Sequence, residues 1–153
     1  MAHVTNLNHA VLWVRDVDRS VRFYSDVLGF EVIERMDSRA AFLRAKDSPQ
    51  HHDLGLFAVG ADAPQPPRGS VGLYHLAWQV PSIRDLAELH DKLVAAGSLV
   101  GSSDHGVSKS LYAHDPDGIE FEVMWLTPRE SWGENEEQEL KPLDLQRELA
   151  AWA

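Results

Sequence analysis

Two histidines and one glutamate in this 153-residue chain have the residue types and spacing of a metal site. His9 lies in the apolar run Leu-Asn-His-Ala-Val-Leu-Trp-Val, and His75 lies 66 positions later in the similar run Leu-Tyr-His-Leu-Ala-Trp-Gln-Val. Glu122 lies in an alternating run that follows the turn Asp-Pro-Asp-Gly. A carboxylate on the inner face of a strand is costly to bury unless a cation or a proton compensates. Two imidazoles and one carboxylate would supply that cation, because they form the triad that holds a divalent metal and leaves coordination positions open.

Each of these residues also fits a site without a metal. A single histidine on an apolar strand is more often a hydrogen-bonded core residue than a ligand, but two histidines at equivalent places favour the metal hypothesis. Glu120 shares a strand face with Glu122 and is the rival carboxylate ligand. We favour Glu122 because it lies deeper in the predicted sheet. The chain contains no cysteine, so nitrogen and oxygen must hold any metal.

The elements that position these residues occur in the same order twice. Each half predicts a buried strand, a helix that ends at a glycine, and then three extended segments. In the first half the strands are expected at residues 7–14, 30–34, 40–44 and 54–59. In the second half they are expected at residues 73–80, 99–101, 110–113 and 119–125. Residues 60–72 are rich in proline and glycine and indicate a linker, so we expect two modules, at about residues 7–60 and 73–126.

The composition limits the classes of function. The chain is 44% hydrophobic and 25% charged, as in a globular protein, and no apolar run approaches the roughly 20 residues of a membrane span. A net charge of −10 argues against binding to nucleic acid or to an anionic membrane. The first residues lack the basic region and apolar core of a signal peptide, so we expect a cytoplasmic location.

The last segment, residues 128–153, has a different composition from the rest. It contains seven acidic and three basic residues, a net charge of −4. We expect its first part to be a solvated extension outside a single domain at residues 1–127. Its four apolar residues Leu143, Leu145, Leu149 and Trp152 are spaced as in a short amphipathic helix that packs on the domain or on a partner chain.

The chain resembles the vicinal-oxygen-chelate (glyoxalase/bleomycin resistance/dioxygenase) superfamily over about residues 7–125, and within it the type I extradiol ring-cleaving dioxygenases. The run Phe-Tyr-Ser-Asp-Val-Leu-Gly-Phe at residues 23–30 is similar to the helix that follows the family's first-ligand strand. The run Gly-Ile-Glu-Phe-Glu at residues 118–122 is similar to the family's terminal run, whose last glutamate ligates iron. The resemblance implies an α+β fold in which two βαβββ modules form an incomplete mixed β-barrel around a metal held by His9, His75 and Glu122.

Further matches point to the residues around the metal. The run His-His-Asp-Leu at residues 51–54 is similar to the family's paired-histidine strand, which implies that His52 is the acid/base residue. Tyr112 matches the tyrosine that hydrogen-bonds the substrate oxygen, and His105 is a candidate pocket histidine. Without the resemblance, the histidine pair also fits a solvated strand edge, and the tyrosine fits a core aromatic.

The resemblance also implies an activity. We expect Fe(II), or Mn(II) as in some relatives, and an enzyme of the catechol 2,3-dioxygenase type that cleaves an aromatic vicinal diol with O2 in aromatic catabolism. A homodimer is implied as well. Leu56 lies where glyoxalase-type members place a further ligand, and leucine cannot ligate. The alternatives are another metal-dependent reaction of the superfamily (isomerase, lyase or thiol transferase) and a drug-binding module without chemistry.

Overall fold

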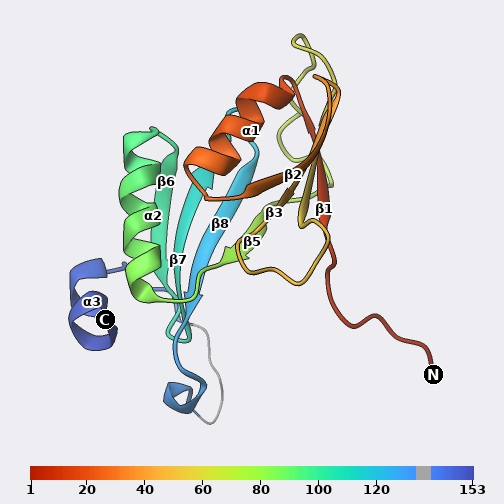
Figure 1. The fold of residues 1–153 in the computed structure, drawn as a ribbon. Coiled ribbons are helices and arrows are strands. Elements are labelled where there is room, and N and C mark those ends of the chain that lie inside the picture. The colour runs from red at the N-terminus through yellow and green to blue at the C-terminus, as the bar shows by residue number, and fades with distance from the viewer. Residues whose placement is uncertain (134–138) are drawn as a thin grey trace. The chain divides into compact units, whose positions relative to one another are not determined.

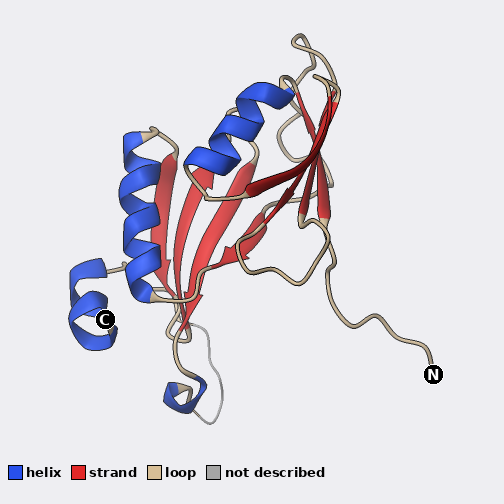
Figure 2. Ribbon diagram, in the orientation of Figure 1, coloured by secondary structure: helices blue, strands red, loops and turns tan. Residues whose placement is uncertain are grey.

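The computed structural model describes residues 1–133 and 139–153, and the chain divides into two compact units, Met1–Ser70 and Val71–Ala153, each described by itself (Figure 1). Each unit contains one four-stranded mixed sheet, and neither sheet closes into a barrel (Figure 2). Both units have the predicted βαβββ order. The predicted α+β fold of two βαβββ modules is therefore confirmed.

In the first unit, a short helix follows the first strand and packs against the four-stranded sheet. Its elements are β1 (Ala10–Val14), α1 (Val17–Asp26), β2 (Glu31–Met36), β3 (Ala40–Arg44) and β4 (Leu54–Ala58). The sheet order is β1-β4-β3-β2, with β1 and β4 parallel and the other pairs antiparallel. The side chain of Asp16 caps α1 by accepting from the backbone N–H of Arg19, and Gly29 has a φ of 77° just after the helix ends. The buried core includes Leu12, Val14, Tyr24, Leu43 and Leu54.

The second unit repeats this arrangement. Its elements are β5 (Leu76–Gln79), α2 (Ile83–Ala95), β6 (Leu99–Asp104), β7 (Ser108–His114) and β8 (Glu120–Leu126). The sheet order is β5-β8-β7-β6, with β5 and β8 parallel, so that β6 is an edge strand. The side chain of Ser82 caps α2, and Gly97 has a φ of 66° after its end. The buried core includes Ile83, Leu86, Leu93, Leu111, Phe121 and Val123.

The repeat offset of 66 residues holds at three element starts. β1 and β5 begin at residues 10 and 76, α1 and α2 at 17 and 83, and β4 and β8 at 54 and 120. The first strand of each module is shorter than predicted, so His9 and His75 each lie one residue before their strand. The reason is that β4 begins at Leu54, which pairs with Ala10, and no ladder partner is left for the residues before Ala10.

The linker and the C-terminal segment lie outside the two modules. Residues 60–72 contain no helix or strand, as expected of a linker. The last segment contains a short 3₁₀ helix, η1 (Arg129–Ser131), and the helix α3 (Leu145–Trp152). α3 packs against α2 (Figure 1). The ring of Trp152 lies 5.9 Å from that of Trp125.

Two further expectations concern the C-terminal extension and the membrane. The predicted solvated extension includes Glu134, Glu136 and Glu137, which lie outside the described residues. Among residues 1–133 and 139–153, no helix has both the length and the apolar character that crossing a bilayer would require.

Candidate functional site

A histidine cluster lies at the edge of the first sheet where β1 and β4 begin. Because these two strands are parallel, His9, directly before β1, and His52, two residues before β4, come to the same edge. Their ring centroids lie 4.6 Å apart. Nδ1 of His51 lies 3.1 Å from Nδ1 of His52. The structure thus brings together two of the predicted site residues, His9 and His52.

The segment that carries His52 is fixed through Asp53. The carboxylate of Asp53 accepts hydrogen bonds from the backbone N–H of Ala45 and from the hydroxyl of Ser48, both at 2.8 Å. Its backbone carbonyl accepts from the N–H of Ala10 at 2.9 Å. Asp53 therefore joins the histidine pair to β1 and to the turn that follows β3.

The hydrogen bonds of His9 determine which of its nitrogens is free to bind a metal. Nδ1 of His9 lies 2.8 Å from Oδ1 of Asn8, and the amide of Asn8 donates to Oε1 of Gln50 at 2.5 Å. An amide oxygen only accepts, so Nδ1 carries a proton, and in the neutral ring Nε2 keeps its lone pair. This is the form of imidazole that ligates a metal through Nε2.

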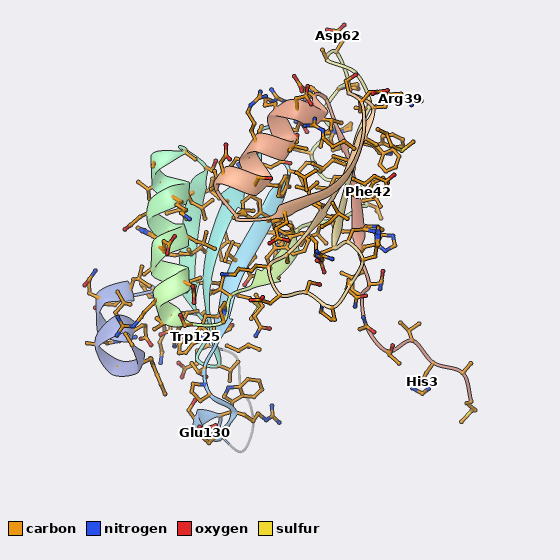
Figure 3. All side chains as sticks on the ribbon, in the orientation of Figure 1. His3, Arg39, Phe42, Asp62, Trp125 and Glu130 are labelled. Carbon is orange, nitrogen blue, oxygen red and sulfur yellow. The ribbon has the colours of Figure 1, made fainter. Side chains whose placement is uncertain are left out.

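His52 lies against an aromatic row on the same sheet. Burial, followed by the charges of His9 and His51, lowers the pKa of His52 below its ordinary value. Phe42 lies on β3 (Figure 3). Its ring lies 5.1 Å from that of His52 and 5.7 Å from that of Phe57, and the ring of Phe57 lies 6.1 Å from that of Trp13. Aromatic side chains therefore extend from His52 across β3, β4 and β1. Because its pKa is lowered, His52 is neutral at neutral pH, and the neutral imidazole is the form that accepts a proton.

In the second unit, His75 lies between two carboxylates. Its Nε2 lies 3.2 Å from Oε2 of Glu122, and its Nδ1 lies 3.7 Å from Oε1 of Glu120. The second oxygen of Glu120 lies 3.7 Å from Nε2 of His114. Glu122 is the more deeply buried acid, with 12% of its side chain exposed against 24% for Glu120. The expectation that both carboxylates share one strand face agrees with their common contact to His75.

The turn before β8 sets the position of these acids. Oδ1 of Asp115 accepts from the backbone N–H groups of Asp117 and Ile119 at 2.8 and 2.9 Å. Gly118 has a φ of 80°, which an L side chain rarely adopts. The predicted Asp-Pro-Asp-Gly turn therefore forms, and it delivers the chain into β8 directly before Glu120.

The pair of His75 and Glu122 fits a divalent cation. Two ligand atoms that each lie about 2.1 Å from an ion, at a right angle, are about 3.0 Å apart. The observed separation of Nε2 and Oε2 is 3.2 Å. No group of three or more histidine, aspartate or glutamate side chains in residues 1–133 and 139–153 is arranged as a complete metal cage. Neither unit by itself therefore supplies the predicted triad.

Tyr112 lies on the same sheet as Glu122, and His105 lies in the turn between β6 and β7. Tyr112 pairs with Glu122 across β7 and β8, and its ring lies 5.9 Å from that of His75. Its hydroxyl lies 3.0 Å from Nε2 of His105. The structure thus brings four predicted site residues together in the second unit.

Two neighbours of this group were missed in the sequence. His114 lies two residues after Tyr112 on β7, so the two-residue period of a strand would have found it. Ser103 lies 2.7 Å from Nε2 of His105, but a single serine gave no signal in the sequence.

The family follows from a comparison with known proteins. The model of the Glyoxalase/Bleomycin resistance protein/Dioxygenase superfamily matches residues 6–123. The chain belongs to this superfamily. A solved structure of a glyoxylase/bleomycin resistance protein/dioxygenase domain from Frankia sp. EAN1pec is 24% identical, with a TM-score of 0.67, and the match covers 83% of this chain and 96% of that one. The superfamily fold is therefore shared with a solved protein.

Sequence relatives include several dioxygenases. Catechol-2,3-dioxygenase of Bacillus subtilis (strain 168) is 31% identical over 87% of this chain and 46% of its own length. Biphenyl-2,3-diol 1,2-dioxygenase 3 of Rhodococcus globerulus is 33% identical over 86% of this chain and 70% of its own length. The chain thus spans about half the length of the Bacillus relative.

Two other relatives carry names that bear on the metal and on the reaction. Manganese-dependent 2,3-dihydroxybiphenyl 1,2-dioxygenase of Geobacillus genomosp. 3 is 25% identical over 92% of this chain and 42% of its own length. Glyoxylase I 4 of Arabidopsis thaliana is 32% identical over 79% of this chain and 71% of its own length. Membership of the superfamily therefore does not by itself decide the reaction.

Proposed function

We propose that this protein is a metal-dependent extradiol dioxygenase, which opens the ring of an aromatic vicinal diol with O2. The observation that carries the proposal is that each module places a histidine at the entry of its first strand, next to a residue suited to the same chemistry. His9 lies beside His52, and His75 lies beside Glu122. The names of the dioxygenase relatives support the same reaction.

The proposed metal ligands are His9, His75 and Glu122. The hydrogen bond of Nδ1 leaves Nε2 as the nitrogen of His9 that could bind a metal, and the spacing of His75 and Glu122 fits one cation. We favour Fe(II), with Mn(II) as the second choice because one relative is named manganese-dependent. When bound, the metal supplies Lewis-acid chemistry that makes the diol hydroxyls more acidic.

The protein's own groups then handle the protons and hold the substrate. His52 accepts a proton from the diol and later returns one, since its lowered pKa keeps it neutral at neutral pH. Tyr112 binds and orients an oxygen of the ring, and the aromatic row that begins at Phe42 packs against apolar substituents. Both atoms of O2 enter the ring-opened product as one carbon–carbon bond breaks, so no further reductant is needed.

The test is a turnover assay on protein loaded with metal. The protein is purified without oxygen, loaded with Fe(II) or Mn(II), and given catechol, 3-methylcatechol or 2,3-dihydroxybiphenyl with O2. We expect oxygen uptake and a coloured ring-opened product. His52→Gln should abolish turnover without loss of bound metal, and the matched control His51→Gln should keep most of it. One metal ion bound per chain with no turnover of any diol would refute the dioxygenase assignment but would still support the metal site.

A second candidate is an isomerase, lyase or thiol transferase of the same superfamily, which the match to Glyoxylase I 4 favours. Leu56 argues against a glyoxalase, because the fully buried leucine at the position equivalent to Glu122 cannot act as a fourth ligand. Such an enzyme would work without O2. A binding module without chemistry would retain no metal, so metal analysis separates it from both enzymes. The homodimer implied by the family resemblance belongs to the proposal and is checked by light scattering.

A further inference from the structure

A stretch of the C-terminal segment, residues 139–141, pairs with the end of the edge strand β6. The N–H of Asp104 donates to the carbonyl of Lys141 at 2.8 Å, and the N–H of Lys141 donates to the carbonyl of Asp104 at 2.9 Å. The N–H of Glu139 donates to the carbonyl of His105 at 3.1 Å. This stretch therefore holds the backbone on which His105 lies.

A network of ion pairs centred on buried side chains holds the same segment near its other end, at α3. The carboxylate of Asp104 lies 2.5 Å from Nζ of Lys109 and 3.1 Å from a guanidinium nitrogen of Arg147. Nζ of Lys109 also lies 3.7 Å from the carboxylate of Glu148 on α3. Asp104, Lys109 and Glu148 are each at most 5% exposed. Two acids and two bases therefore fasten α3 to the β6–β7 hairpin.

The side chain of His105 is held by the backbone of this segment. Its Nδ1 lies 2.9 Å from the carbonyl oxygen of Glu139. A carbonyl oxygen only accepts, so Nδ1 must carry a proton, and in the neutral ring Nε2 is left as an acceptor. Nε2 lies 3.0 Å from the hydroxyl of Tyr112 and 2.7 Å from the hydroxyl of Ser103. As an acceptor, Nε2 can only receive hydrogen bonds from these two hydroxyls.

The tautomer of His105 decides what Tyr112 offers to a ligand. With Nε2 as an acceptor, the phenol proton points to His105 and the phenol oxygen is left to accept a hydrogen bond from a substrate hydroxyl. With a proton on Nε2, that nitrogen would donate to the phenol oxygen, and the phenol proton would point away from His105. One backbone carbonyl therefore sets the polarity of the hydroxyl of Tyr112, whose ring lies 5.9 Å from that of His75.

We propose that the C-terminal segment is a positioning device for Tyr112, in which the carbonyl of Glu139 fixes His105 as the Nδ1–H tautomer and thereby makes Tyr112 a hydrogen-bond acceptor toward substrate. The role in catalysis rests on the proposed function, whereas the tautomer of His105 does not. Glu139 acts through His105, so it is a positioning residue.

The test compares two substitutions at Lys141. Lys141→Pro removes the backbone N–H that donates to Asp104, and Lys141→Ala removes the same side chain but keeps that N–H. Imidazole ¹⁵N NMR of the metal-free full-length protein should show His105 as the Nδ1–H tautomer in the wild type and in Lys141→Ala, with the other tautomer populated in Lys141→Pro. In the metal-loaded protein, Lys141→Pro should lower kcat for 2,3-dihydroxybiphenyl by about 10- to 100-fold with little change in KM or in bound metal.

Several results would overturn the proposal. A wild-type His105 with its proton on Nε2 would do so without any variant, and so would a Lys141→Pro protein that keeps the native tautomer and full kcat. If Lys141→Pro does not fold, Arg147→Gln, which cuts the link between α3 and Asp104, replaces it with the same expected direction. A wild type that turns over no diol but has the Nδ1–H tautomer would refute the proposed function and leave the positioning of His105 standing.

Discussion

Replacing Lys109 by methionine tests the buried charge network most directly. Nζ of Lys109 lies 2.5 Å from Asp104 and 3.7 Å from Glu148, and only 6% of the lysine side chain is exposed. Lys109→Met keeps the volume but leaves two buried carboxylates with Arg147 as their only remaining cation in the network. Such a loss is expected to reduce the free energy of unfolding, because uncompensated buried charge is costly.

The size of the loss can be estimated from the distances. At an effective dielectric constant of about 20, unit charges 3.7 Å apart attract by about 4.5 kcal/mol. The regained solvation of the lysine offsets part of the lost attraction, and breaking a buried pair by removing one partner typically costs about 3 to 5 kcal/mol. Against a total stability of about 5 to 15 kcal/mol, this is a large fraction.

The assay is urea unfolding followed by tryptophan fluorescence, because Trp125 and Trp152 report on the docking of α3. With an m-value of about 2 kcal/mol/M, the unfolding midpoint should fall by about 1.5 to 2.5 M. The matched control is Lys92→Met, since Lys92 pairs with Glu88 at 2.8 Å on the surface, where such a pair contributes about 0.5 kcal/mol. A shift for Lys109→Met no larger than that of the control would refute the reasoning, as would strict additivity with Glu148→Gln.

Two further predictions concern other carboxylates. Asp53→Ala removes the acceptor of two hydrogen bonds at the histidine cluster and should cost about 1.5 to 3 kcal/mol, seen as a fall in Tm of several degrees; an unchanged Tm would contradict the anchoring role. Burial acts to raise the pKa of Asp104, but hydrogen bonds from Lys109 and Gly106 and the charge of Arg147 outweigh it, so the pKa is lowered. A lowered pKa means that the stability contributed by the ionised Asp104 carboxylate is complete above the ordinary aspartate pKa of about 3.9 and is lost as the pH falls through the lower folded value. The difference in unfolding free energy between the wild type and Asp104→Asn should therefore shrink as the pH falls below about 4, and a constant difference would contradict it.

Local signals in the sequence predicted much of the fold. The caps at Asp16 and Ser82 and the turn that ends at Gly118 depend on residues within one turn of chain, so single positions were enough to place them. The repeat offset was equally readable, because equivalent residues recur in order. The ends of the strands could not be read from the sequence, since the start of β1 is decided by a partner strand more than 40 residues away.

The candidate site was predictable to the extent that it uses repeated positions. His9, His75 and Glu122 were proposed from the repeat and the resemblance, and the neighbours of His75 agree with the expected strand face. The sequence predicted a short C-terminal helix packed on the domain or on a partner chain, and α3 packs against α2. The ion pairs that hold this helix were not predicted, because the charged residues Asp104 and Lys109 gave no sequence signal for burial. Only the three-dimensional pairing of a distant helix shows that their charges are compensated.

The pairing of residues 139–141 with β6 has a consequence for the behaviour of the protein in solution. An uncovered edge strand presents free N–H and C=O groups that recruit strands of other molecules and lead to aggregation. In the first sheet, the edge strand β2 carries Glu31, Glu34 and Arg35, whose charges discourage such contacts. At the end of β6, residues 139–141 of the same chain cover the edge of the sheet. Proteolytic loss of the C-terminal segment would therefore expose this edge to strands of other molecules.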